Sequence, residues 1–326
     1  MIKKHIYILA TGGTIAGRAA SEEATTGYQA GAIGVADLLA AVPEIRRYAE
    51  VEGEQIAAID SKDMREVIWL RLAARCNALL SREDVDGIVI THGTDTMEET
   101  AYFLHLTVHS EKPIVLTGAM RPATAMSADG PMNLLQAVRV AADDEAAGKG
   151  VLVVFNGTIE SARDAVKMHT TSLDTFRSPE MGALGSVQDG EPVFYRSPLR
   201  CHTVHSVFSV KGVTALPRVA ILYAHADDDG FLVAAAQKAG CQGIVYAGMG
   251  NGSIPERVET ALAKAAAEGI AGAAVVLDLA REQHAQRGRP RDAGRGVVRG
   301  KWLHRERHAE SREGARPAAA RPAEDE

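Results

Sequence analysis

Short runs of apolar residues recur along the first half of the chain, each followed by glycine or polar residues and then by a helical spacing of apolar positions. Four such runs cover residues 6–10, 87–91, 113–117 and 151–155. Continuous apolar strands that alternate with helices are typical of a parallel sheet covered on both faces. The pattern therefore predicts an α/β domain built on a doubly wound parallel sheet.

A second set of strands follows a polar, proline-marked stretch at residues 197–217. A chain of 326 residues is long enough for two cores. We therefore predict a larger N-terminal domain, 1–205, and a smaller C-terminal α/β domain, 206–276. The strands of the second set are residues 219–223, 243–247 and 273–276, and they alternate with alanine-rich helices.

Two helix starts follow strands closely. Thr96 and Glu99 have the spacing of a capping box, and Asp129 precedes a glycine and Pro131. A hydroxyl or carboxylate at such a position accepts hydrogen bonds from the first turn, and proline is tolerated near the first helical position. We expect Thr96 and Asp129 to cap helices.

Composition and charge favour a small-molecule partner. The chain has 46% apolar and 24% charged residues, and its formal net charge is −6. Nucleic acids and anionic membrane surfaces need a basic face. No apolar run reaches the length of a membrane span, and residues 6–10 are too short for a signal peptide. We expect a cytoplasmic protein, or a periplasmic one if a leader was removed, with no nucleic-acid or membrane partner.

The first strand runs into a glycine pair followed by Thr14. Paired glycines allow the backbone to approach a ligand closely, and Thr14 projects a hydroxyl into that space. A phosphate loop has similar spacing, but the chain contains neither GxxxxGK(S/T) nor GxGxxG. A plain strand turn is the simpler alternative.

A second strand ends in the sequence THGTDT at residues 91–96. Ligands of open α/β sheets bind at this edge, outside the carboxyl ends of the strands. A threonine hydroxyl is a weak nucleophile until a neighbouring base or positive charge activates it. Lys167 and Tyr28 are candidates for that role, although a solvated lysine and a loop tyrosine are simpler interpretations. Asp95 also suits a helix cap.

Five motifs together resemble the bacterial type II L-asparaginase and glutaminase-asparaginase family over residues 4–276. The first two, in this order and at this separation, are highly specific. The resemblance implies hydrolysis of the side-chain amide of L-asparagine, a possible glutaminase side activity, and no metal or organic cofactor. The motifs are ATGGTIAG at 10–17, ITHGTDTMEET at 90–100, GAMRP at 118–122, MSADGP at 126–131 and AGMGNG at 247–252.

The resemblance also implies residue roles. Thr14 would attack the amide carbon while Tyr28, in a mobile lid at residues 27–31, assists proton transfer. Backbone N–H groups near Gly13 would stabilise the oxyanion. The sequence leaves Thr94 as the alternative nucleophile.

The resemblance also implies a second set of side chains, at the end of the strand that runs into the THGTDT motif. Lys167 would polarise Thr94, and Asp95 would bind the substrate α-ammonium by a charge-assisted bond. The other implied substrate-binding residues are Ser61, which would hold the α-carboxylate, together with Ala119 and Asn251.

Three positions qualify the resemblance. Lys62 follows Ser61 where many relatives have Gln or Glu, and we expect it to add positive charge beside the α-carboxylate pocket. Some periplasmic relatives bridge the cysteine matching Cys76, but the matching partner position here is His105, so we expect no bridge. Histidine ordinarily titrates near neutrality, which would suit His92 to catalysis, yet the family pattern implies that His92 supports its loop rather than reacts.

The tail departs from the family after residue 276. Residues 281–321 contain eleven arginines and few large apolar residues, so we expect residues 277–326 to be disordered. Relatives close instead with a helix of the type GF(I/V)ASDTLNPQKARVLL. The codons that can encode residues 302–318 include sets that spell this ending when they are read from the second nucleotide of each codon. We interpret the tail as frameshifted, and a genuine basic extension is the alternative.

The altered tail bears on assembly and activity. In the family, a glutamate from the missing ending and the residue matching Asn251 reach across an intimate dimer to the neighbouring site. We expect a homotetramer of such dimers if the second domain folds. A catalytically impaired homologue is the alternative function.

A subunit of an amidotransferase acting on misacylated tRNA is the rival enzyme that shares this domain. Such a subunit would carry an additional N-terminal module and a basic RNA-facing surface. We expect residues 1–10 to leave no room for the module, and the net charge of −6 disfavours the basic surface.

Overall fold

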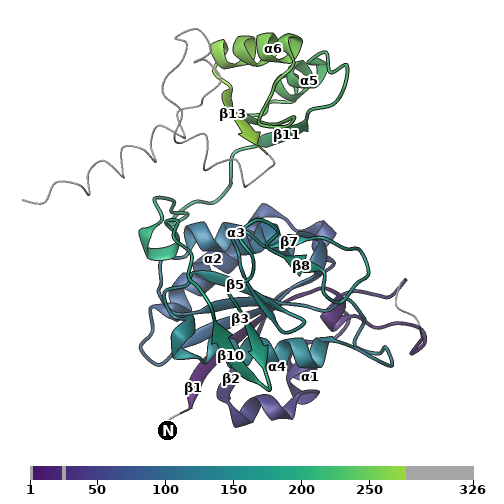
Figure 1. The fold of residues 1–326 in the computed structure, drawn as a ribbon, viewed down its shortest axis with the longest axis vertical. Coiled ribbons are helices and arrows are strands. Elements are labelled where there is room, and N and C mark those ends of the chain that lie inside the picture. The colour runs from purple at the N-terminus through teal and green to yellow at the C-terminus, as the bar shows by residue number, and fades with distance from the viewer. Residues whose placement is uncertain (1–2, 24–26, 277–326) are drawn as a thin grey trace, which may run out of the picture. The chain divides into compact units, whose positions relative to one another are not determined.

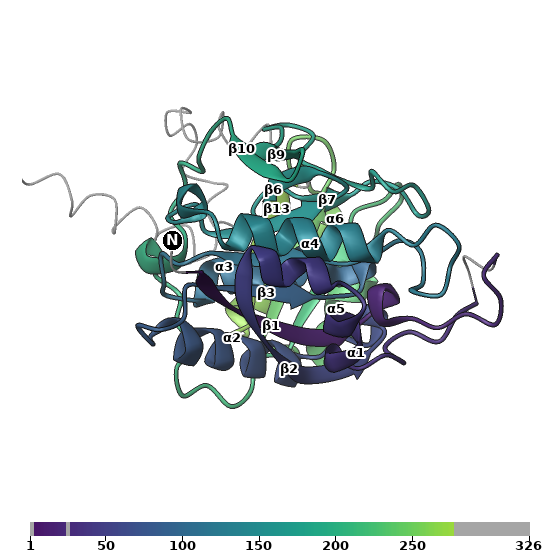
Figure 2. The ribbon, with the colours of Figure 1, turned by 90° about the horizontal axis from the view of Figure 1, so that it is seen from below.

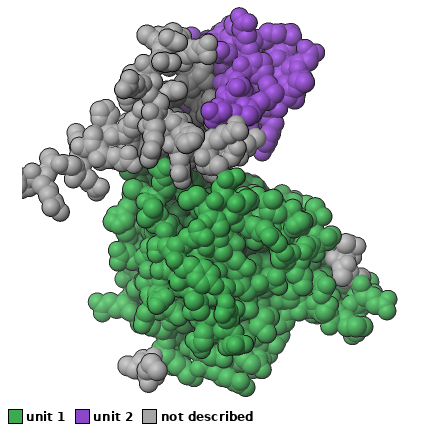
Figure 3. Space-filling view, in the orientation of Figure 1, with its two compact units in different colours: residues 1–215 green, residues 216–326 purple. Residues whose placement is uncertain are grey.

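The computed structural model describes residues 3–23 and 27–276 (Figure 1), so the predicted tail lies outside the described residues. The chain divides into two compact units, residues 1–215 and 216–326, coloured separately in Figure 3. The segment after residue 205 stays with unit 1. Ser206 Oγ donates a 2.5 Å hydrogen bond to the Leu106 carbonyl, and Val210 packs against the unit 1 core.

Unit 1 is built on a sheet with strand order β10-β9-β6-β5-β4-β3-β1-β2. The strands from β2 to β5 are parallel, as predicted, and β6, β9 and β10 add antiparallel pairs. The strands are β1 (Lys4–Gly12), β2 (Ala49–Ile59), β3 (Gly87–Thr91), β4 (Ile114–Thr117), β5 (Val151–Phe155), β6 (Thr158–Ser161), β9 (Gly185–Gln188) and β10 (Glu191–Phe194), with a separate hairpin of β7 (Val166–Lys167) and β8 (Phe176–Arg177).

Successive residues of the apolar strands serve two different cores. Ile6 and Ile8 of β1 pack with α1 (Val35–Ala40) and α4 (Gly130–Ala141), whereas Tyr7 and Leu9 pack with α2 (Glu66–Leu80) and α3 (Met97–Thr107). Side chains alternate along a strand, so a continuous apolar run can supply both faces. In Figure 1, α2 and α3 lie above the unit 1 sheet and α4 and α1 below it, and Figure 2 views the latter pair in front.

Unit 2 is the smaller α/β domain that the second set of strands predicted. Its parallel sheet has the order β11-β12-β13. Ile244 and Tyr246 of the middle strand pack against Val233 and Leu262, one from each of the two helices. In the part of the chain that the structure describes, no helix has both the length and the apolarity to cross a membrane. The elements are β11 (Val219–Tyr223), α5 (Phe231–Lys238), β12 (Gly243–Gly248), α6 (Glu256–Ala267) and β13 (Ala271–Val276).

The two predicted helix caps lie at helix starts but do not cap. Helices α3 and α4 begin directly after Thr96 and Asp129, yet neither side chain accepts a hydrogen bond from a backbone N–H in the first turn of its helix. Thr96 Oγ1 donates instead to the Ser61 carbonyl at 2.8 Å. The Asp129 carboxylate accepts the N–H groups of Met120 and Arg121, each at 2.9 Å. The capping prediction is therefore wrong, because both side chains tie neighbouring loops together.

His105 lies near the end of α3 against the chain segment that leaves unit 1. Its Nδ1 accepts the Val151 N–H at 3.1 Å, and its ring lies 4.8 Å from that of His202. Burial lowers the pKa of His105 to about 3, and the nearby charges of His202 and Arg163 act in the same direction. The imidazole is therefore neutral near pH 7.

We expect the stability of unit 1 to fall with acidity through His105. The pKa is 6.5 in the ordinary case and about 3 in the folded protein, so the unfolded state binds more protons between these values. Above pH 6.5 His105 is neutral in both states, and its titration does not lower the free energy of unfolding. Below pH 6.5, this group alone should lower the free energy of unfolding by roughly 1.4 kcal/mol per pH unit.

His105→Asn keeps an acceptor for the Val151 N–H but cannot titrate. Denaturant unfolding measured from about pH 7 to about pH 4 should therefore show a shallower decline for the variant. Parallel curves for the two proteins would contradict the assignment.

Candidate active site

Two loops meet where the order of strands in the sheet reverses. The chain passes from β1 to β2 on one side and later to β3 on the other, which opens a crevice at the carboxyl ends of β1 and β3. Thr14 begins a short 3₁₀ helix just after the end of β1, and Thr94 begins another just after the end of β3. Their exposed fractions are only 6% and 5%. Both candidate nucleophiles therefore lie in the predicted place.

Glycines allow these loops to interlock. A Cβ on Gly13 would lie 2.3 Å from the backbone nitrogen of Gly93, and a Cβ on Gly12 would lie 2.4 Å from the carbonyl oxygen of Ile59 in β2. Gly13 also has a φ of 77°, which favours glycine. Its N–H donates to the Ile59 carbonyl at 2.8 Å. The ends of β1, β2 and β3 thus form one backbone cluster.

Tyr28 lies directly on Thr14. The phenol oxygen is 2.6 Å from Thr14 Oγ1. Arg18 and Gln29 exchange two backbone hydrogen bonds of 3.0 Å, which bring Tyr28 back toward β1. A Cβ on Gly17 would lie 2.8 Å from the Thr14 carbonyl oxygen and 3.0 Å from the tyrosine ring, so a larger residue here would crowd both groups. This arrangement allows a proton to pass between the phenol and the threonine hydroxyl.

Lys167, in β7, joins the second set. Its Nζ donates to Thr94 Oγ1 at 2.8 Å and to Asp95 Oδ1 at 2.5 Å. An ammonium group has no acceptor, so Thr94 Oγ1 accepts this bond and keeps its own hydrogen for another partner. The lysine side chain is 16% exposed and the aspartate side chain 57%. The carboxylate is therefore open to a ligand while the ammonium is covered.

Ser61 lies at the end of β2 beside these residues and is only 2% exposed. Its Oγ accepts the Asp95 N–H at 3.2 Å, which leaves the hydroxyl hydrogen available. The neighbouring Lys62 pairs with Asp60 at 3.4 Å and with Asp63 at 2.7 Å. The positive charge expected beside the pocket is therefore balanced locally by two carboxylates.

Family comparisons cover both units of the chain. Residues 5–200 match the family described as Asparaginase, N-terminal, and residues 218–307 match the Glutaminase/Asparaginase C-terminal domain. The chain belongs to the asparaginase family. The family predicted from the five motifs is confirmed.

Individual relatives agree with the family match. The L-asparaginase 2 of Bacillus subtilis (strain 168) is 52% identical over 266 residues, which cover 82% of this chain and 71% of that protein. The glutaminase-asparaginase of Pseudomonas fluorescens biotype A is 46% identical over 266 residues, 82% of this chain and 73% of that protein. A crystal structure from Campylobacter jejuni titled "Probable Cytoplasmic L-asparaginase" has a TM-score of 0.82 at 49% identity and covers 85% of each chain. The predicted two-domain α/β fold is confirmed.

Two further predicted residues of this asparaginase-family chain belong to other loops. Ala119 follows β4 in a loop fixed by a 3.0 Å bond from Asn133 Nδ2 to the Gly118 carbonyl. A Cβ on Gly118 would lie 2.4 Å from the His92 carbonyl, so this loop adjoins the one after β3. Asn251 lies in an exposed turn after β12 and belongs to unit 2, whereas the other candidates belong to unit 1.

Glu98, in the first turn of α3, is a contact of this site that the sequence reasoning missed. Its Oε2 accepts the backbone N–H of Lys167 at 2.6 Å. Burial raises the Glu98 pKa, and the hydrogen bond from the Lys167 N–H acts in the opposite direction. Asp95, Glu98 and Lys167 border a cavity of about 270 Å³ with residues 168–170. The repeated acidic pair in THGTDTMEET was the available signal, but it was interpreted as part of a capping box.

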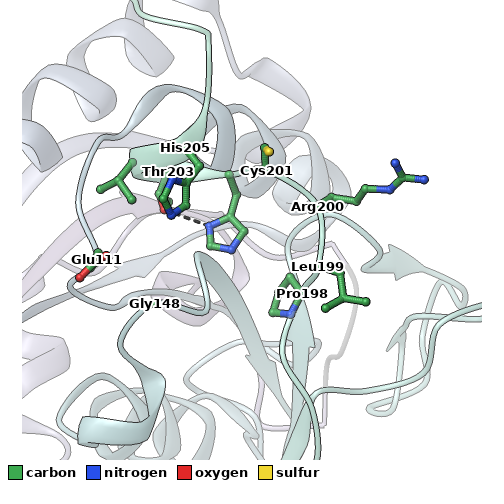
Figure 4. A pocket seen from close by; sticks show the side chains of 10 residues that line it. Glu111, Gly148, Pro198, Leu199, Arg200, Cys201, Thr203 and His205 are labelled. Atoms are coloured by element: carbon green, nitrogen blue, oxygen red, sulfur yellow. Dashed lines mark hydrogen bonds between the residues drawn. The ribbon is translucent and has the colours of Figure 1, made fainter. Parts of the chain in front are cut away.

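A separate hollow of unit 1 contains none of the predicted site residues. It measures about 270 Å³ and is bordered by residues 198–205 with Glu111 and Gly148 (Figure 4). Within residues 3–23 and 27–276, no group of three His, Cys, Asp or Glu side chains is suited to a metal ion. We place the candidate asparaginase site at the crevice between β1 and β3, because the buried Thr14 and Thr94 lie there with Tyr28 and Lys167 as hydrogen-bond partners.

Glu98→Ala should loosen the attachment of Lys167. The variant leaves the partly buried Lys167 N–H without its acceptor, so the free energy of unfolding should fall by about 1–3 kcal/mol. Glu98→Gln keeps a carbonyl oxygen and should lose less. Glu99→Ala is the matched control, because Glu99 is the exposed neighbour on the same helix turn. Equal losses in Glu98→Ala and Glu99→Ala would argue against this contact.

Proposed function

We propose that this chain hydrolyses the side-chain amide of L-asparagine to give aspartate and ammonia. The observation that carries the proposal is the pair of buried threonines at the switch point of the sheet. Each threonine hydroxyl has a proton-transferring or polarising partner, Tyr28 at 2.6 Å from Thr14 and Lys167 at 2.8 Å from Thr94. The names of the relatives, L-asparaginase and glutaminase-asparaginase, support the same substrate class.

Acyl transfer to Thr14 is the chemistry that this geometry favours. Tyr28 accepts the hydroxyl proton and passes its own phenolic proton on toward the amide nitrogen as Thr14 Oγ1 forms a bond to the amide carbon. The carbon–nitrogen bond then breaks, the nitrogen takes up a proton, and ammonia leaves. Water attacks the resulting ester, which releases aspartate and restores the Thr14 hydroxyl.

The developing oxyanion needs a donor other than Gly13 itself. The Gly13 N–H already donates to the Ile59 carbonyl at 2.8 Å. The backbone N–H of Thr14, at the start of its 3₁₀ helix, is our candidate for the predicted oxyanion donor near Gly13. Fixed backbone dipoles of this kind stabilise charge that appears only in the transition state.

Substrate recognition follows from the groups left available. The Asp95 carboxylate is exposed and suits an α-ammonium group, while Lys167 Nζ donates to its Oδ1 at 2.5 Å. Ser61 retains a hydroxyl hydrogen for an α-carboxylate. Ala119 and Asn251 complete the proposed substrate-binding set, and the proposed reaction needs no metal or organic cofactor. The glutaminase side activity, the homotetramer and the cytoplasmic location stay predictions.

The proposal predicts ammonia release from L-asparagine by the purified full-length chain in a coupled assay. Thr14→Val and Thr94→Val should each lower kcat at least ~10³-fold, because each removes a hydroxyl of the reacting machinery. Thr260→Val, in α6 of unit 2, is the matched control and should retain activity. Acid quenching should trap an aspartyl ester on the peptide that carries Thr14, whereas an ester on Thr94 would reverse the assignment.

Absence of ammonia release would contradict the proposed function for this chain. A version with the family ending restored after residue 276 separates two causes. Activity in the restored version alone would favour the impaired homologue, and inactivity in both would remove the asparaginase assignment of the site.

A further inference from the structure

Three hydrogen bonds run in sequence through the α2–α3 side of unit 1 to the loop after β3. Trp69 Nε1 donates to Thr100 Oγ1 at 2.8 Å. Thr100 Oγ1 lies 2.9 Å from His92 Nε2, and His92 Nδ1 lies 2.7 Å from the Gly93 carbonyl oxygen. Thr100 and His92 are fully buried. Trp69 lies at the outer end of this series and stacks on Phe103 with ring centroids 5.4 Å apart.

The two ends of the series set the directions of its bonds. The Gly93 carbonyl can only accept, so the proton of the neutral His92 ring is on Nδ1 and Nε2 is an acceptor. Thr100 Oγ1 therefore directs its single hydrogen to His92 Nε2. The indole N–H can only donate, so Thr100 Oγ1 accepts from Trp69 with a lone pair. Each group has a partner, and reversing any one bond would set two lone pairs or two hydrogens against each other.

Burial keeps His92 in the neutral form that this arrangement requires. Desolvation lowers the pKa of His92 to about 4, against the weaker effect of the hydrogen bond to the Gly93 carbonyl. The ring is therefore neutral throughout the neutral pH range. A histidine held in this way does not exchange protons with a substrate, in agreement with the supporting role expected for it.

Gly93 is the point at which this series reaches the site. Its backbone touches Gly13, and a Cβ on Gly93 would lie 2.6 Å from Ser61 Oγ. Thr94, the next residue, carries the hydroxyl that accepts the Lys167 hydrogen bond. A rotation of the Gly93 peptide would therefore displace the neighbours of both threonines at once. The hydrogen bond from His92 Nδ1 holds the Gly93 carbonyl in its present orientation.

We propose that Trp69 and Thr100 are positioning residues of the site, because they fix His92 as its Nδ1–H tautomer and thereby hold the Gly93 carbonyl and Thr94 in place. The inference rests on the proposed asparagine hydrolysis for its kinetic consequence. The tautomer itself can be measured without any substrate. Failure of the proposed function and failure of this inference are therefore distinguishable.

Thr100→Val removes the hydroxyl while keeping a β-branched side chain of similar size. His92 Nε2 and the Trp69 N–H both lose their partner, and kcat should fall roughly 10- to 100-fold through misplacement of the Thr94 loop, with KM changed much less. Thr100→Ser restores the hydroxyl and should restore kcat to within a few fold. Thr107→Val is the matched control, because Thr107 is a buried threonine of the same helix whose hydroxyl bonds the Phe103 carbonyl instead.

Long-range ¹H–¹⁵N correlation spectra of protein labelled with ¹⁵N-histidine report the tautomer directly. The His92 signals are those that shift in Trp69→Phe, because that variant frees the Thr100 hydroxyl to turn. We expect the Nδ1–H pattern in the unaltered protein, unchanged from about pH 5.5 to 8. An Nε2–H pattern overturns the inference. So does a loss of kcat in Thr107→Val as large as that in Thr100→Val, or a failure of Thr100→Ser to restore kcat.

Discussion

The close backbone approach of Gly13 to Gly93 is the constraint on which the candidate site depends. Neither residue has space for a side chain, since a Cβ on Gly13 would meet the Gly93 backbone and one on Gly93 would meet Ser61. This contact joins the loops that follow β1, β2 and β3. Two threonines that are far apart in the sequence thereby become parts of one crevice, each with its own proton-handling partner.

Polar side chains around the crevice hold loops rather than helices. Thr96 and Asp129 have the local sequence of helix caps, but they bond the Ser61 carbonyl and the backbone of Met120 and Arg121. Glu98 likewise uses its carboxylate on the Lys167 backbone. The helices α3 and α4 form without these caps because tertiary packing of their apolar faces supplies most helical stability. The caps are thereby free to fix the loops on which catalysis would depend.

Much of this arrangement could be predicted from the sequence, and the failures have physical reasons. The parallel strands were readable because their runs are apolar on both faces, and the two site loops because they follow such runs. The partnership of Lys167 with Thr94 was not readable from spacing and came only from the resemblance, because the β7–β8 hairpin determines where the lysine lies. The hairpin between β5 and β6 was missed although Asn156 and Gly157, both with positive φ, are a strong turn signal. Glu98 was missed because its carboxylate contacts the Lys167 backbone, which sequence patterns do not show.

The most direct test of the central constraint is the activity of Gly13→Ala compared with Gly148→Ala. Both glycines have positive φ, 77° and 72°, so both variants carry similar backbone strain. Only Gly13 faces another backbone, whereas a Cβ on Gly148 would meet nothing within 4 Å. We predict that Gly13→Ala lowers kcat/KM for L-asparagine by about 10²-fold or more and that Gly148→Ala changes it little. Equal activity in the two variants would contradict the account.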